Sequence, residues 1–113
     1  MRIAVTSQNF RSITSHAGMT RRFLIYETQP DGGVAEIDRL DLPKSMSLHQ
    51  YHGADHPLYG LDVVVTGGCG EGFVQRLGAY GVRVIATAET DPLKAATAVA
   101  AGEELVPALL HEH

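Results

Sequence analysis

The chain has 113 residues, 44% of them hydrophobic, and its 13 Asp plus Glu against 9 Lys plus Arg give a formal net charge of -4. This length suits a single domain over residues 1–113, and the acidic balance argues against a nucleic-acid partner, which requires a concentrated basic face. No segment is long and apolar enough to span a bilayer, and polar residues interrupt the first apolar stretch early, so we expect a cytoplasmic protein with no membrane partner.

The first half of the chain predicts three strands. RIAVTS, residues 2–7, is a short apolar strand, and the polar stretch that follows it is predicted to be a long loop. RFLIYET, residues 22–28, and VAEIDRLDL, residues 34–42, are rich in residues that favour strands. The Pro-Asp-Gly-Gly sequence between them is a hairpin signal, so these two strands are predicted to be antiparallel. Residues 43–60 show neither a helical nor a strand period.

The second half alternates strands with helices. LDVVVTG, residues 61–67, is predicted to be a central strand buried on both faces of a sheet. A helix is expected over residues 71–81 and a strand over residues 82–87. A last helix is expected from Asp91, as its cap, to Gly102. The predicted apolar stripe of the first helix consists of Phe73, Val74, Leu77 and Tyr80. This order predicts an α/β protein with parallel strands and a ligand site at their carboxyl ends.

A glycine-rich loop carrying the single cysteine follows the valine strand. In TGGCGEG, residues 66–72, Cys69 stands where the chain leaves the sheet and begins a helix. Backbone N–H groups at a helix start favour negative charge, so we expect a lowered thiol pKa and a thiolate able to bind metal. The loop also partly matches a dinucleotide fingerprint, with Glu89 at the spacing of a ribose-binding acid. A third interpretation is that the glycines only allow strand and helix to pack closely.

The histidines are the second candidate group. His49, His52 and His56 fall within eight positions. Positions three and four apart share a helical face, so the three imidazoles could converge on one metal if the segment were helical. In a polar loop they would instead be unpaired histidines without a shared role. If the first strand lies beside the valine strand, His16 opens at the same sheet end as Cys69. A thiol with several imidazoles favours soft or borderline metals.

Five stretches together resemble one known family. MRIAVTS, SHAGMTRRFLIYE, the His52-Gly53 pair, the text from Leu61 to Gly70 and YGVRVIAT are similar to segments of the dinitrogenase iron-molybdenum cofactor biosynthesis family. The resemblance implies a ribonuclease H-like α/β fold, in which a five-stranded mixed sheet with an antiparallel second strand is flanked by helices. It implies no nuclease activity, because the first strand lacks the carboxylate that a two-metal nuclease needs.

The resemblance implies a non-catalytic carrier that holds an iron-sulfur or iron-molybdenum type cluster, or its precursor, and passes it on. Its partners would be cluster-assembly or acceptor proteins of the nitrogenase type, and we expect a monomer or a weak homodimer. The implied cargo-binding residues are Gly67, Gly68, Cys69, Gly70, Glu71, Gly72 and His16. The candidate metal ligands are Cys69, His16, His49, His52 and His56.

Two other functions stay open at this point. A nucleotide-binding or regulatory module would use the glycine loop and Glu89, but it would give the histidines no role. A structural interaction domain would use neither group.

Overall fold

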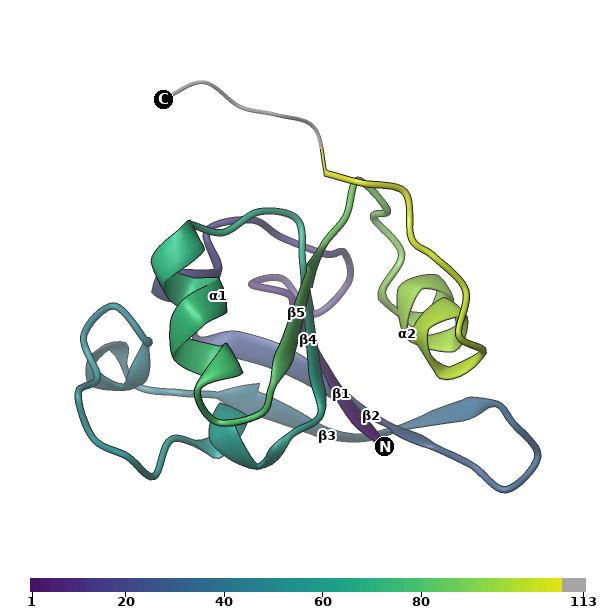
Figure 1. Cartoon of the computed structure of the whole chain (residues 1–113), viewed down its shortest axis with the longest axis horizontal. Helices are drawn as coiled ribbons and strands as arrows, with labels where there is room; N and C mark the ends of the chain where they lie inside the picture. Colours follow the sequence, from purple (N-terminus) through teal and green to yellow (C-terminus); the bar gives the residue numbers. More distant parts are fainter. Residues whose placement is uncertain (109–113) are drawn as a thin grey trace.

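The structure, a computed structural model, describes residues 1–108 and is built around a five-stranded mixed sheet with the order β3-β2-β1-β4-β5 (Figure 1). The strands are β1 (Arg2–Thr6), β2 (Arg22–Thr28), β3 (Val34–Asp41), β4 (Val63–Thr66) and β5 (Arg83–Ala86). β1, β4 and β5 are parallel, whereas β2 is antiparallel to both β1 and β3. The predicted fold class, including the antiparallel second strand, is therefore confirmed.

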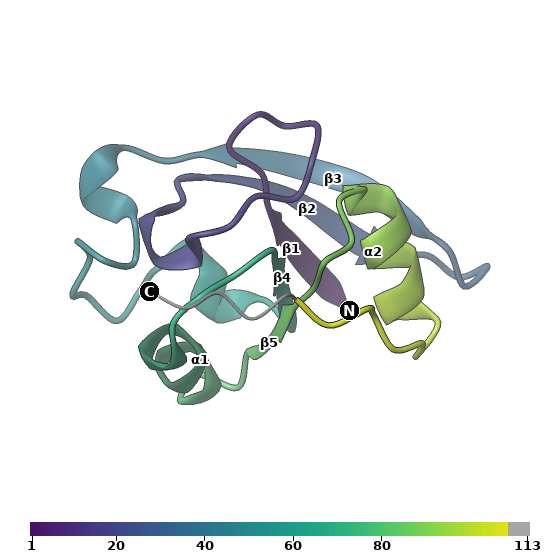
Figure 2. The ribbon, with the colours of Figure 1, turned by 90° about the horizontal axis from the view of Figure 1, so that it is seen from above.

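One helix covers each face of the sheet, as Figures 1 and 2 show from two directions. The helices are α1 (Glu71–Gly78) and α2 (Pro92–Ala100). Three short 3-10 turns lie in the connections: η1 (Ala17–Met19), η2 (Lys44–Met46) and η3 (Pro57–Gly60). Within residues 1–108, no helix combines the length and the apolar character needed to cross a membrane.

The alternating side chains of the strands divide the interior into two cores. In β4, Val63 and Val65 belong to the core beneath α2, while Val64 belongs to the core beneath α1. All three valines are at most 4% exposed, because a strand sends successive side chains to opposite faces and both faces are covered here. This explains why the predicted central strand is an unbroken apolar run.

The helix ends follow the sequence signals closely. The Asp91 carboxylate accepts hydrogen bonds from the backbone N–H groups of Leu93 at 3.0 Å and Lys94 at 3.3 Å, so it caps α2 as predicted. Gly81 and Gly102 follow α1 and α2 with φ values of +77° and +74°, a conformation that glycine adopts without strain.

The predicted stripe of α1 is wrong at two positions. Phe73 and Leu77 are buried, but Val74 and Tyr80 are 42% and 43% exposed. Val74 is one residue beyond Phe73 and is therefore turned about 100° away from the core. Tyr80 lies past the end of the helix, where its ring stacks on that of Tyr59 with a centroid distance of 3.8 Å.

Candidate functional site

The loops that follow β1, β4 and β5 meet at the carboxyl end of the parallel strands. The Gly67 N–H donates to the Thr14 carbonyl at 3.0 Å, and the Ala17 N–H donates to the Gly68 carbonyl at 3.1 Å. The Ile13 N–H, in the same first loop, donates to a carbonyl of the β5 loop at 2.8 Å. As predicted from the sheet order, the loops carrying His16 and Cys69 lie side by side.

Two buried threonines hold these loops together. Thr6 and Thr66 end the neighbouring strands β1 and β4, and both are 0% exposed. The Thr6 hydroxyl donates to the Thr14 carbonyl at 2.6 Å, and the Thr66 hydroxyl accepts from the Gly68 N–H at 3.3 Å. A Cβ atom added to Gly67 would lie 3.3 Å from the Thr14 carbonyl oxygen, so this close approach favours glycine.

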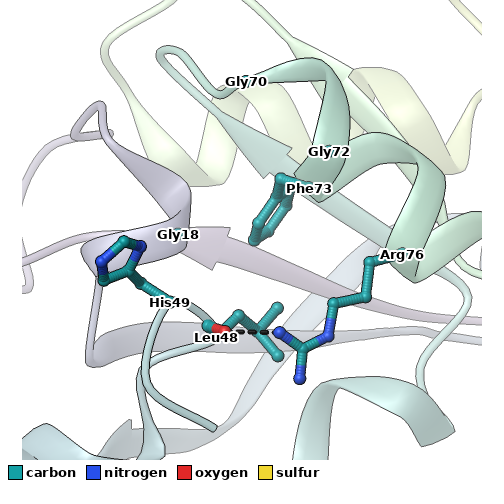
Figure 3. A pocket seen from close by; sticks show the side chains of 7 residues that line it. All are labelled: Gly18, Leu48, His49, Gly70, Gly72, Phe73 and Arg76. Atoms are coloured by element: carbon teal, nitrogen blue, oxygen red, sulfur yellow. Dashed lines mark hydrogen bonds between the residues drawn. The ribbon is translucent and has the colours of Figure 1, made fainter. Parts of the chain in front are cut away.

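A cavity of about 380 Å³ opens beside this loop cluster, within the range of roughly 300 to 1,000 Å³ that is typical of small-molecule sites (Figure 3). Its lining residues are Gly18, Leu48, His49, Gly70, Gly72, Phe73 and Arg76. They come from η1, from the connection between β3 and β4, and from the N-cap and first two turns of α1. None of these lining residues, all in the described part of the chain, carries a carboxylate.

Arg76 and His49 lie on opposite sides of this cavity, with Phe73 and Leu48 between them (Figure 3). Leu48 is 4% exposed and Phe73 is 8% exposed, and both belong to the core beneath α1. The floor of the cavity therefore consists of packed apolar core side chains. The walls offer a guanidinium, an imidazole and the glycine-bounded start of a helix, which together suit an anionic ligand.

His49 lines the cavity, whereas His16 directly precedes η1, whose Gly18 also lines it. The His49 side chain is exposed, and its backbone N–H donates to the Gly18 carbonyl at 2.8 Å. His16 is also exposed and stands directly before η1 with φ +59° and ψ +53°, an uncommon left-handed conformation for a residue other than glycine. The structure thus brings the segments of His16 and His49 together through η1.

His56 has a structural role instead. It is only 3% exposed, its Nε2–H donates to the Met46 carbonyl at 2.6 Å, and its Nδ1 accepts from the Leu58 N–H at 3.1 Å. Its ring packs against Tyr51 and Tyr59 at centroid distances of 5.2 and 5.6 Å. Burial lowers the pKa of His56, and the nearby positive charge of Arg76 lowers it further.

The three clustered histidines do not share one helical face, because residues 47–56 form turns rather than a helix. His52 is exposed in this connection, while His56 is buried. Throughout residues 1–108, no group of three or more His, Cys, Asp or Glu side chains is arranged to hold a metal ion. The segment is therefore a loop, but His56 is buried and paired within it, so the loop alternative holds for only part of the cluster.

Cys69 differs from the expectation in its chemistry. The residue stands just before Gly70, the N-cap of α1, as predicted, but its half-buried side chain packs against the core beneath α1. Burial raises the pKa of the Cys69 thiol, so the predicted lowering is wrong. The cause is desolvation, because burial disfavours the charged thiolate.

Glu89, one of the two supports of the dinucleotide interpretation, already has partners within the protein. The Glu89 carboxylate accepts hydrogen bonds from the backbone N–H groups of Thr90 at 2.8 Å and Asp91 at 3.0 Å, and it lies 3.5 Å from the Lys94 ammonium. These N–H groups lower the pKa of Glu89. The carboxylate is already engaged in shaping the loop before α2, so a ribose hydroxyl would have to compete for it.

The sequence patterns did not single out Arg76, although one signal for it exists. In the predicted helix, Arg76 follows the core residue Phe73 by three positions and immediately precedes the core residue Leu77. A cation so placed borders the buried face of the helix, where it needs acceptors from another segment. The sequence gives no indication of which carbonyls those are.

Comparison with solved structures shows an α/β fold of known type. The crystal structure of the protein PH0822 is 18% identical, with a TM-score of 0.71 over 93% of this chain and 96% of that one. The NMR structure of TM1290, described as a candidate NifB protein from Thermotoga that belongs to the DUF35 family, is 19% identical. Its TM-score is 0.62, over 99% of this chain and 98% of that one. At these identities the likeness shows the fold alone.

The family is defined by the sequence itself. The model of the family described as "Dinitrogenase iron-molybdenum cofactor" matches residues 1–102, and the chain belongs to this family. The predicted resemblance is thereby confirmed. No match is found among curated proteins.

Proposed function

We propose that the protein binds an anionic iron-sulfur or iron-molybdenum type cluster, or a precursor, and delivers it during metallocofactor assembly without catalysing a reaction. The observation that carries this proposal is the cavity between η1 and α1, which combines Arg76, His49 and a glycine-bounded helix start with no lining carboxylate. Sulfide-bridged clusters with thiolate or sulfide ligands are anionic, so such a lining would attract them. Family membership supports the same assignment.

The residues divide into ligands and charge-bearing groups in this proposal. His49 and His16 are the first candidates for ligands, because both side chains are exposed. His49 lines the cavity, and His16 directly precedes η1, which contributes Gly18 to the lining. Cys69 could ligate only after losing a proton that burial helps it to retain. Arg76 and the first turn of α1 would offset the negative charge of the cargo.

The open form of the site is suited to transfer. A carrier must release its cargo, and few ligands on an exposed surface release a cluster more readily than an enclosing cage would. The partners in this proposal are cytoplasmic cluster-assembly or acceptor proteins, with the carrier acting as a monomer or a weak homodimer.

The test is anaerobic reconstitution. The purified apoprotein is mixed with iron-sulfur or iron-molybdenum cofactor donors and desalted, and its visible spectrum and metal content are recorded. We expect the parent protein to retain the cluster and His49→Ala and His16→Ala to lose most of it. His52→Ala is the matched control, because His52 is exposed and does not line the cavity. Failure of the parent protein to retain any cluster would refute the carrier function, and binding of a nucleotide instead would favour the regulatory alternative.

A further inference from the structure

Arg76 connects the two walls of the cavity. It projects from the second turn of α1, whose first turn forms one wall, and reaches the connection between β3 and β4, which forms the other. We propose that Arg76 is a positioning residue that fixes His49 at the cavity. This inference rests on the proposed function, because it concerns how the cargo site is kept in place.

The contacts of the guanidinium bracket His49 on both sides. Nη1 donates to the carbonyl of Leu48 at 2.5 Å, Nη2 donates to the carbonyl of Tyr51, and Nε donates to the phenol oxygen of Tyr59 at 2.8 Å. Leu48 immediately precedes His49, and Tyr51 follows it by two residues. The His49 N–H is in turn bonded to the Gly18 carbonyl at 2.8 Å. The backbone around His49 is thus held from α1 on one side and from η1 on the other.

Only arginine suits this set of acceptors. A guanidinium offers five N–H donors in a rigid planar fork, so one side chain can reach two carbonyls and a phenol at once. A lysine ammonium carries the same charge at a single point on a flexible stem, and it could not span all three acceptors. The geometry therefore requires the shape of the group as well as its charge.

The same contacts leave the charge of Arg76 available to the cargo. All three acceptors are neutral, and the four ion pairs found within residues 1–108 do not include Arg76. Hydrogen bonds from a charged donor are stronger than those between neutral groups, so one residue both holds the wall and presents positive charge to an anion.

The first test needs no cargo. Amide hydrogen exchange at His49 is compared between the parent apoprotein and Arg76→Lys, with the amide of Val64 in β4 reporting global opening. We expect exchange at His49 to accelerate about tenfold relative to Val64, the factor expected when a hydrogen bond to a charged group is lost. Arg83→Lys is the matched control, because Arg83 is an exposed residue of β5 that does not line the cavity.

The second test is cluster retention by the same variants. Arg76→Lys should retain about tenfold less cluster than the parent protein despite keeping its charge, while Arg83→Lys should match the parent. An unchanged exchange rate at His49 in Arg76→Lys overturns the proposal, as does faster exchange with undiminished retention. If the parent protein itself retains no cluster, the proposed function fails, whereas the exchange data still decide whether Arg76 fixes His49.

A milder variant covers the case in which Arg76→Lys does not fold. Tyr59→Phe removes only the phenol oxygen that accepts from Arg76 Nε. It should accelerate exchange at His49 about threefold relative to Val64, because one of the three contacts is lost. An unchanged rate in this variant overturns the proposal.

Discussion

Replacing His56 by alanine would remove the side chain that closes the connection between β3 and β4. In the folded protein this ring donates to the Met46 carbonyl at 2.6 Å and accepts from the Leu58 N–H at 3.1 Å. Both bonds link parts of the chain around η2 and η3 that have little regular structure of their own. Their loss would leave a backbone donor and acceptor without these partners in a region that is 3% exposed at His56.

The magnitude follows from these contacts. Two hydrogen bonds contribute about 1 kcal/mol each, and the lost packing against Tyr51 and Tyr59 adds a similar amount. We therefore expect His56→Ala to lower the free energy of unfolding by about 2 to 4 kcal/mol. His49→Ala and His52→Ala, at exposed positions of the same connection, should each change it by less than about 0.5 kcal/mol.

Urea denaturation followed by circular dichroism measures this difference directly. The three histidine variants are compared at pH 7.5, where the His56 ring is neutral in both folded and unfolded states. A loss below about 1 kcal/mol for His56→Ala, or equal losses for all three variants, would refute the structural role assigned to His56.

Four further predictions concern the pH dependence of stability, the thiol of Cys69 and the loop contact at Gly67. The folded-state pKa of His56 lies below its ordinary value of 6.5, so the unfolded chain binds more protons in acid. The contribution of His56 to stability should therefore be intact above pH 6.5 and decline below it. The urea midpoint should fall between pH 7 and pH 5 in the parent protein, and this fall should be absent in His56→Ala. The raised pKa of Cys69 predicts slow alkylation by iodoacetamide at pH 7 relative to a free cysteine peptide, and equal rates would contradict its burial. Cys69→Ala should cost about 1 kcal/mol or less in a thermal melt, whereas a larger loss would make the residue part of the core. Gly67→Ala should lower stability by about 1 to 2 kcal/mol through crowding of the Thr14 carbonyl and Ser15, and a neutral result would show that the two loops can separate at no cost.

Local signals explain why most of the fold was predictable. The hairpin between β2 and β3 is encoded in four consecutive turn residues, and the start of α2 in the Asp91-Pro92 pair. The burial of β4 on both faces is encoded in its valines. In each case the residues that determine the structure are close together in the sequence, so they can be interpreted without knowledge of the fold.

The candidate site was predictable only in part, because it depends on contacts between distant residues. The loops of His16 and Cys69 were expected to meet from the sheet order alone, and they do. The sequence of residues 43–60 shows no periodic pattern, because the path of this segment is set by Arg76 and His56. Both side chains bond to backbone carbonyls, which every residue possesses, so the sequence does not mark the contact points. The thiol pKa was mispredicted because the burial of Cys69 depends on side chains far from it in the sequence.

The division of the interior into two cores separates two kinds of evolutionary constraint. The cavity floor, Leu48 and Phe73, lies entirely in the core beneath α1, while the core beneath α2 contributes no lining residue. Substitutions beneath α2 need only preserve volume and apolar character, whereas those beneath α1 also alter the shape of the cavity. Divergence should therefore proceed faster on the α2 side, and a change in the shape of the cavity should be recorded in the residues beneath α1.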